Sequence, residues 1–345
     1  MLMKRAMVIA AAMFGATAVQ AQTNNDAVAN FYKGKQVTII VGSSAGGGYD
    51  TYARLFARHL PRFIPGRPTI VVQNMPGAGS ARAAGHLARI APKDGTAMGI
   101  IQPGALVGPL FERKPDPNYD ATQFLYLGSA DSSNRVCITM AQSKIKTFED
   151  AQRITSIAGT AGNGSSSRDY AFLHKNTSNA KFNLVGGYEG MANLFLALER
   201  GEVDVICGFD WASVKAQRPS FVQEKKINIL VQAGLEPFGE LTKLGVPEIW
   251  KYTQGERNIA IVKLVVAQQL FGRPFMFPPG TPKERVDMLR AAFDKAFNDP
   301  ELLADAAKMG ADITPASGLK VQETIQGMYA ASPELVAAAS KAIRE

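Results

Sequence analysis

A short apolar strand, followed by a glycine-rich turn and an amphipathic helix, constrains the fold of this chain more than any other segment. Residues 37–41 read VTIIV, a mainly β-branched run typical of a strand buried on both faces. Three consecutive glycines at 46–48 then allow a tight turn and the close approach of a ligand. Apolar residues recur at helical spacing over 49–60. The segment therefore predicts a strand–turn–helix unit, the building block of α/β folds.

This turn has two interpretations. A helix that begins in a glycine-rich turn presents unpaired backbone N–H groups and the positive end of its dipole, which favour an anion. The alternative is a tight turn between strand and helix that binds no ligand. Asp50 falls in the first turn of the helix, where a carboxylate complements the dipole and orients the loop. Direct contact with a ligand is the other role open to it.

The N-terminus predicts a secretory signal peptide over residues 1–21. Lys4 and Arg5 precede an apolar and small-residue run over 6–19, and the small residues that end it fit cleavage after Ala21. A membrane anchor, the alternative, needs about 20 apolar residues, and this run is shorter. No later segment approaches that length. We therefore expect an exported, periplasmic protein whose mature chain has no integral membrane segment.

Composition argues against several classes of function. The 345-residue chain has a net charge of +8, but its basic residues are dispersed, so nucleic acid is not an expected partner. The three histidines are scattered, with no acid at ligand or triad spacing, and each is expected at the surface or in a helix cap. Walker A and H-E-x-x-H sequences are absent. We expect no metal, no cofactor and no catalysis; an exported hydrolase with a serine nucleophile is the enzyme alternative.

The strand, turn and helix pattern recurs along the chain. In a first block, strands are expected at 37–41, 69–72 and 98–101. After a proline-rich crossing, a second block has expected strands at 135–140, 155–158, 182–185, 203–207 and 227–231, with a helix at 191–200. Beyond residue 282 the chain is expected to be helical. The alternation predicts mainly parallel sheets in two α/β lobes.

Three glycine-rich turns carry the expected chemistry. Ligands of open α/β sheets bind at the carboxyl ends of the strands, where the N-termini of helices also point. We expect the turns at 43–50 and 77–80 to face the turn at 162–168 across a cleft between the lobes. Their N–H groups, serine hydroxyls and the amide of Asn163 suit a carboxylate, although serine and asparagine are also ordinary turn formers.

The same segments resemble the Bug family, the periplasmic receptors of tripartite tricarboxylate transporters. The similar segments are GSSAGGGYDTYAR at 42–54, NMPGAGSARAAGHLARIAPKDGTAMG at 74–99 and GTAGNGSSSRDY at 159–170. The resemblance continues, in the family's order, with GYEG at 187–190, GEVDV at 201–205 and PPGTP at 278–282. It extends from about residue 31 to about residue 310, and the ordered series is more specific than any single motif.

The resemblance implies a type II periplasmic binding protein fold, with two α/β lobes, a ligand cleft between them and two chain crossings. We place lobe 1 at 22–128 and 234–345, and lobe 2 at 129–233. The implied function is a receptor that closes on a small organic acid and delivers it to membrane permease subunits. A sensory protein that reports an organic acid to a partner receptor would use the same fold. The implied ligand contacts are Ser43, Ser44, Gly47, Gly48, Asp50, Gly79, Ser80, Asn163, Gly164, Ser165, Ser166 and Tyr188.

The two cysteines, Cys137 and Cys207, lie in strand-like segments 70 residues apart in the sequence. A disulfide fits an oxidising compartment, and two separately buried thiols fit the usual location of cysteine. The topology that the resemblance implies makes the two strands neighbours, which supports the disulfide.

One departure from the family bears on the ligand. Glu189 stands where many members have a lysine, and the proline that precedes this element in the family is missing. Either Glu189 faces the solvent or the ligand is less anionic than usual for the family. Phe209, Asp210 and Trp211 leave an aromatic or amphoteric ligand open, with a place in the core as the alternative for these aromatic residues.

Overall fold

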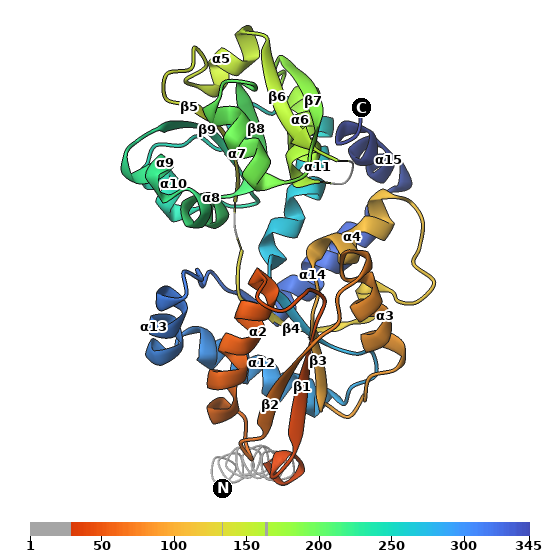
Figure 1. Cartoon of the computed structure of the whole chain (residues 1–345). Coiled ribbons are helices and arrows are strands. Elements are labelled where there is room, and N and C mark those ends of the chain that lie inside the picture. Colours follow the sequence, from red (N-terminus) through yellow and green to blue (C-terminus); the bar gives the residue numbers. More distant parts are fainter. Residues whose placement is uncertain (1–28, 133, 163–164) are drawn as a thin grey trace, which may run out of the picture.

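The computed structural model describes residues 29–345 except 133 and 163–164. Its strands form two mixed sheets, each with helices packed on it (Figure 1). Sheet A has the strand order β11-β4-β10-β3-β1-β2, and sheet B has the order β7-β6-β8-β5-β9. The predicted signal peptide and its cleavage site lie outside the described residues. Across 29–345, those three positions aside, we find no helix with the length and apolar character that crossing a membrane requires.

Sheet A contains β1 (Gln36–Val41), β2 (Thr69–Asn74), β3 (Ala97–Ile100), β4 (Leu125–Ser129), β10 (Pro274–Phe277) and β11 (Ala316–Ser317). Sheet B contains β5 (Arg135–Met140), β6 (Ser156–Ala161), β7 (Phe182–Tyr188), β8 (Val205–Asp210) and β9 (Ile227–Ala233).

The helices up to sheet B's last strand are α2 (Gly48–His59), α3 (Ala81–Arg89), α4 (Pro103–Phe111), α5 (Phe148–Arg153), α6 (Ser166–Thr177), α7 (Met191–Glu199), α8 (Trp211–Gln217) and α9 (Pro219–Gln223). Those that follow are α10 (Gly239–Lys243), α11 (Glu256–Val266), α12 (Lys283–Phe297), α13 (Pro300–Lys308), α14 (Gly318–Tyr329) and α15 (Pro333–Ala342). Short 3₁₀ turns are η1 (Leu60–Phe63), η2 (Ala78–Ser80), η3 (Ala121–Gln123), η4 (Ile249–Lys251) and η5 (Ala267–Phe271).

Strand β1 has the predicted double burial. Val37, Ile39 and Val41 are each at most 1% exposed on one face, and Ile40 on the other face is 3% exposed. Successive side chains of a strand point to opposite faces, so helices must cover both sides of sheet A here. On one side, α2 and α12 bring Phe56 and Phe293 against Phe275 of β10, with the Phe56 and Phe293 rings stacked at 5.3 Å between centroids, and Phe297 packs on Phe56.

The expectation of mainly parallel sheets was wrong. Parallel pairing joins β1 to β2 and β3, and β6 to β7 and β8. Strand β10 pairs antiparallel with both β3 and β4, and β5 pairs antiparallel with both β8 and β9. Strands β5 and β10, which form these antiparallel pairs, are the strands that the chain enters first when it passes from one sheet to the other.

Two passages connect the sheets, and hydrogen bonds hold them together. The chain leaves β4 and enters β5 through 130–134, and it returns from η5 to β10 through Gly272 and Arg273. The Gly272 N–H donates to the Asp131 carbonyl at 2.9 Å, and the Ala130 N–H donates to the Arg273 carbonyl at 3.1 Å. Thr314 adds a third segment, because its N–H donates to the Ala130 carbonyl at 3.1 Å. We call this junction, formed by 130–132, 272–273 and Thr314, the hinge.

The last helix, α15, packs against both groups of elements. It contacts α4 beside sheet A and also contacts α6 and α11, which lie beside sheet B in Figure 1. The Asn176 side chain of α6 donates to the Ala342 carbonyl at 2.9 Å. Ser332 caps α15 by accepting from the Leu335 N–H, and Pro333 occupies its first position, where proline is favoured.

Candidate functional site

A polar cleft of about 330 Å³ lies where elements beside sheet A face elements of sheet B. Its walls come from α2 and α4 on one side and from β5, α6 and β8 on the other, with the hinge at its base. Residues that line it include Tyr49, Phe111, Arg135, Tyr170, Asp210 and Arg273. The cleft therefore sits between two bodies joined by a narrow hinge, a usual location for a small-molecule site.

The first glycine-rich loop is organised around Asp50, which is 3% exposed. One carboxylate oxygen accepts from the Gly46 N–H at 2.8 Å and from Arg54 Nε at 2.9 Å. The other accepts from the Asn74 amide at 3.0 Å. Burial alone would raise the pKa of Asp50, but these hydrogen bonds outweigh it and hold the pKa below its ordinary value. In this structure Asp50 orients its loop, the first of the two predicted roles.

The remaining predicted residues of lobe 1 surround this loop. Ser80 is buried, and its hydroxyl donates to the Gly42 carbonyl at 2.7 Å and accepts from the Gln102 N–H at 3.3 Å. The Ser43 hydroxyl is also buried and has no hydrogen-bond partner within the described residues. Gly47 is half-buried, whereas Ser44 and Gly79 are exposed. None of these residues lines the cleft itself.

Gly48 connects the loop to the cleft. A Cβ atom at Gly48 would lie 3.3 Å from Nη2 of Arg273, closer than an ordinary contact. Arg273 also lies over the ring of Tyr49, with 4.4 Å from its central carbon to the ring centroid, and 5.4 Å from that of Tyr52. The turn and the first residues of α2 thus form a cage around one guanidinium group.

On the sheet B side, the third loop leads into α6. Ser165 caps the helix by accepting from the Arg168 N–H, and Ser166 lines the cleft. Asn163 and Gly164, two predicted contacts, lie outside the described residues. At Gly208, where φ is +76°, a Cβ atom would lie 2.1 Å from the Ser166 carbonyl oxygen. Only glycine lets β8 approach the start of α6 this closely.

Tyr188 ends β7 and Glu189 follows it, and neither residue lines the cleft. Tyr188 is half-buried against the core of sheet B, and Glu189 is exposed. Of the two readings of Glu189, the structure therefore shows the one in which it faces the solvent. Asp210, by contrast, lines the cleft and is 7% exposed.

The sequence reasoning did not identify the arginines of the cleft. Arg135 begins β5, and its Nε donates to the Gln269 side-chain oxygen at 3.1 Å. The Gln269 amide in turn donates to the hydroxyl of Tyr170 in α6. Arg135 and Arg273 carry no motif of their own. The available signal was a single arginine at the start of the otherwise apolar strand RVCITM.

A buried carboxylate lies in the hinge beside these arginines. Asp131 is 3% exposed, and its Oδ1 accepts from the Thr314 hydroxyl at 3.0 Å. Burial, and then the nearby charge of Asp210, raise the pKa of Asp131 to about 6, although Arg273 and Arg135 act in the opposite direction. The base of the cleft therefore holds two arginines and two aspartates in one electrostatic network.

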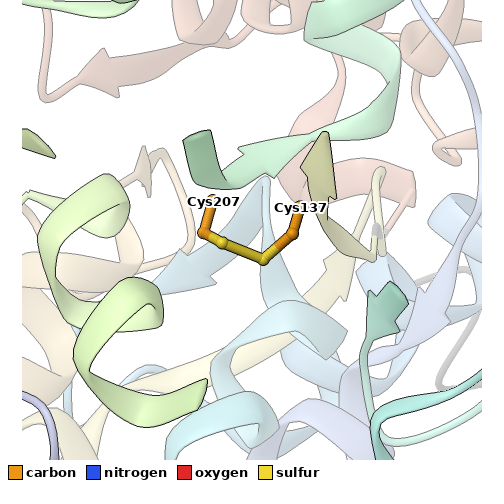
Figure 2. The surroundings of a disulfide bond; sticks show 2 residues. All are labelled: Cys137 and Cys207. Carbon is orange, nitrogen blue, oxygen red and sulfur yellow. A yellow bond between two sulfur atoms is a disulfide. The ribbon is translucent and has the colours of Figure 1, made fainter. Parts of the chain in front are cut away.

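Cys137 of β5 and Cys207 of β8 form a disulfide, with an S–S distance of 2.04 Å (Figure 2). The two strands are neighbours in sheet B, and both cysteines are fully buried. His174 of α6 lies beside them and is 1% exposed, so its expected place at the surface was wrong. Burial lowers the pKa of His174 to about 3. This cluster belongs to the core of the protein and not to the cleft.

The sequence GSSAG at 42–46 also matches the G-x-S-x-G pattern of serine hydrolases, with Ser44 in the position of the nucleophile. The motif requires a histidine that accepts the serine proton. Within the described part of the chain, no histidine hydrogen-bonds to Ser44: His59 contacts Asp305 and Arg62, and His174 is buried beside the disulfide. Among the described residues, therefore, no hydrogen bond joins this serine to a histidine that could act as its general base.

A second pocket, of about 480 Å³, lies beside α4, α14 and α15. Its lining is mainly apolar and includes Leu110, Tyr119 and Tyr329. It contains none of the predicted ligand contacts and no residue of sheet B. We therefore regard the polar cleft as the candidate site.

Comparison with known proteins reveals relatives in sequence and in structure. No protein-family model matches the sequence. A curated protein of Agrobacterium vitis, the UPF0065 protein in the TAR-I ttuE-ttuC′ intergenic region, is 29% identical over 186 residues. That match covers 51% of this chain and 51% of the relative. The chain thus matches about half the length of this curated relative.

Solved structures match almost the whole chain. A TctC solute-binding protein from Polaromonas has a TM-score of 0.69 at 21% identity and covers 87% of this chain and 96% of its own. The periplasmic binding protein BugD has a TM-score of 0.60 at 21% identity, with coverages of 90% and 98%. MatC from Rhodopseudomonas palustris, solved with bound malate, has a TM-score of 0.58 at 21% identity, with coverages of 88% and 99%.

These comparisons confirm the resemblance predicted from the motifs and the predicted two-lobed α/β architecture. At this level of identity the structural matches establish the fold. The chain has the fold of the TctC and BugD periplasmic solute-binding proteins.

Proposed function

We propose that this chain is a periplasmic receptor that captures a small organic acid in the cleft between its lobes. The lobes predicted from the sequence, 22–128 with 234–345 and 129–233, enter the proposal with one change. We assign residues 234–266 to lobe 2, because Leu241 and Val246 belong to the core of sheet B and α11 packs on α6. The single observation that carries the proposal is the polar cleft itself, which has arginines at its base and is bounded by two bodies joined through the hinge and α15. Hinged bodies of this kind close around a ligand.

The relatives support the class of ligand. MatC was solved with malate, a carboxylic acid, and its fold is shared by this chain. In this chain the N-termini of α2 and α6 belong to loops beside the cleft, and helix N-termini favour anions. We propose that the predicted loop residues, from Ser43 to Tyr188, contact the ligand or hold the binding loops in place after the lobes close. We propose no catalytic step.

Delivery to a membrane transporter of the tripartite tricarboxylate type completes the proposal. The signal peptide predicted over 1–21, with cleavage after Ala21, would place the mature chain in the periplasm beside such a permease. A sensory protein that binds an organic acid is the second candidate, because it would use the same cleft. Uptake of a radiolabelled acid by cells that carry the permease, with and without this chain, separates the two functions.

A thermal-shift screen of residues 22–345 tests the binding function. The panel contains mono-, di- and tricarboxylates of three to six carbons, aromatic acids, amino acids and neutral sugars. A ligand at a hundred times its dissociation constant adds about 2.7 kcal/mol of stability. We expect a shift for one class of acid and none for the sugars. A folded, ligand-free protein that no acid stabilises would contradict the proposal.

A further inference from the structure

Two guanidinium groups, those of Arg135 and Arg273, line the cleft, and neither has an ion-pair partner among the described residues. In the part of the chain that the structure describes, Arg135 hydrogen-bonds to neutral groups, the Gln269 side chain at 3.1 Å and the Gly208 carbonyl at 3.5 Å. Arg273 donates from Nη1 to the Gly272 carbonyl at 2.9 Å, and its buried Nε has no hydrogen-bond partner among the described residues. In the same part of the chain, neither guanidinium has a carboxylate oxygen within 4.0 Å.

Arg273 is held in place before any ligand arrives. The rings of Tyr49 and Tyr52 flank its guanidinium, and its backbone N–H donates to the Ser129 hydroxyl at 3.1 Å within the hinge. A buried charge without a partner is costly unless another group compensates it. A ligand carboxylate can accept two parallel hydrogen bonds from a guanidinium fork, which makes this an efficient pairing.

The two arginines come from different sides of the cleft. Arg135 belongs to sheet B, and Arg273 begins the return to sheet A. The hydroxyl of Tyr49 lies within the electrostatic reach of both: burial raises its pKa, while Arg273 and then Arg135 lower it. One carboxylate between the two guanidiniums would therefore connect the two bodies of the protein.

Two aspartates limit how much negative charge this site accepts. Asp210 lies directly opposite Arg135 in the pairing of β8 with β5, lines the cleft, and caps α8 by accepting from the Ala212 N–H at 3.0 Å. Asp131, 3% exposed, adds a second carboxyl group in the hinge, where its Oδ1 accepts from the Thr314 hydroxyl at 3.0 Å. The charged residues that line the cleft are three arginines (Arg135, Arg273 and Arg344) and three acids (Glu112, Asp169 and Asp210), whose formal charges cancel, so a ligand with several carboxylates finds no excess of positive charge.

The other walls of the cleft carry Glu112, Asp169 and Arg344 beside an apolar surface. Tyr49, Val107, Phe111 and Tyr170 contribute aromatic and aliphatic surface to it. Such surface suits the hydrocarbon part of a ligand and not a second carboxylate.

From these contacts we propose that the ligand is an acid with a single carboxylate, which binds between Arg135 and Arg273, and that the rest of the ligand is uncharged or carries an ammonium group. This inference rests on the proposed function and names its substrate class. Asp210 is the residue that disfavours a second carboxylate, and an ammonium group can approach it.

Isothermal titration with matched acids tests the charge preference. The probes are hexanoate, 6-aminohexanoate and adipate, and the shorter set butanoate, 4-aminobutanoate and succinate. Within a set only the distal group changes, from methyl to ammonium to carboxylate. We expect a single-carboxylate member to bind at least tenfold more tightly than the dicarboxylate of its set. Tighter binding of adipate or succinate, or no binding by any single-carboxylate acid in these sets or in the thermal-shift panel, would overturn the inference.

Variants of the two arginines test the location. Arg135→Gln and Arg273→Gln should each weaken binding of the best single-carboxylate acid at least tenfold. Arg257→Gln, an exposed residue of α11 that lies outside the cleft lining, removes the same charge and should change the dissociation constant less than twofold. Wild-type affinity in a folded arginine variant contradicts the assignment. If Arg273→Gln does not fold, the dissociation constants of Arg135→Gln and Arg273→Lys for the same acid test the assignment instead.

Asp210→Asn tests the negative wall. Asparagine can keep the cap of α8 while the charge is lost, so the dicarboxylates should gain at least fivefold in affinity and the single-carboxylate acids should change little. An unchanged ratio would refute the role of Asp210. The outcomes also separate the two proposals: if a dicarboxylate binds best, the receptor function stands and this inference fails, whereas no binding by any acid contradicts both.

Discussion

At the scale of single residues, Asp50 illustrates how a buried carboxylate shapes a binding loop. Its partners are the Gly46 N–H, the Arg54 side chain and the Asn74 amide. Replacement by alanine leaves the Gly46 and Asn74 donors without an acceptor. We expect Asp50→Ala to lower the free energy of unfolding by about 1–3 kcal/mol, measured by urea denaturation, and to weaken acid binding. Glu323→Ala, an exposed helical position, should lie within about 0.5 kcal/mol of the wild type. No loss of stability in Asp50→Ala would show that the loop does not depend on this carboxylate.

His174 makes the protein sensitive to acid. Its folded pKa of about 3 lies below its ordinary value of 6.5, so the unfolded chain binds more protons between these values. The free energy of unfolding is therefore not reduced by His174 above pH 6.5, and it decreases as the pH falls from 6.5 towards 3, because the unfolded chain gains a proton there that the folded chain does not. From pH 7 to pH 5 the loss amounts to about 2 kcal/mol.

We therefore expect His174→Leu to reduce the loss of stability between pH 7 and pH 5, measured by urea denaturation at each pH. Asp131 acts in the opposite direction, because its raised pKa makes the folded state bind more protons between pH 4 and pH 6. Asp131 is present in both proteins, so the difference between them isolates His174. Equal pH dependence in the variant and the wild type would contradict the burial of a neutral imidazole.

Several of these residue roles could be predicted from the sequence. The pattern of glycines and Asp50 predicted a turn oriented by a first-turn carboxylate, because those preferences are local. Arg135 and Arg273 could not be predicted, since their meeting depends on the pairing of β5 with β8 and on the hinge. His174 was misplaced because a lone histidine in a helix gives no indication of its burial.

At the scale of elements, the disulfide connects β5 to β8 across 70 residues of sequence. Closing a loop of that length restricts the unfolded chain. We expect Cys137→Ala/Cys207→Ala to lower the free energy of unfolding by about 2–4 kcal/mol, measured with guanidinium chloride. The wild type treated with a reductant should lose a comparable amount. Free thiols detected in the untreated, denatured protein would contradict the bond.

Gly208 is the position where β8 passes closest to α6. A Cβ atom there would lie 2.1 Å from the Ser166 carbonyl oxygen, in a backbone with φ of +76°. We expect Gly208→Ala to lose about 2–4 kcal/mol of stability, measured by thermal denaturation. Gly186→Ala in β7 is the matched control, because its Cβ would meet only Thr160 Oγ1, at 3.6 Å. Equal stability of the two variants would be incompatible with the close approach.

The sequence predicted the strands more accurately than it predicted their partners. The expected strand at 135–140 coincides with β5, and the expected strand at 37–41 lies within β1. Strands β4 and β10 were missed because LYLGS and PFMF are short apolar runs without alternation. The parallel expectation failed because β10 and β5 pair with strands distant in the sequence, and local periodicity carries no information about such pairing.

At the scale of the whole molecule, the resemblance contributed what local patterns could not. Periodicity indicated two α/β blocks, whereas the cleft and the hinge follow from how residues 130–132, 272–273 and Thr314 meet. The resemblance to the Bug receptors implied that arrangement, and the matches to TctC and BugD confirm the fold. The contact of α15 with both α4 and α6 could not be anticipated from its alanine-rich sequence.

A crystal structure of residues 22–345 with the best acid from the thermal-shift screen tests the central claim most directly. We expect the acid in the polar cleft, its carboxylate within hydrogen-bond distance of Arg135 and Arg273, and the two lobes closer together than in the ligand-free protein. An acid bound instead in the apolar pocket beside Tyr119 and Tyr329, or a cleft left empty at saturating concentration, would contradict the account.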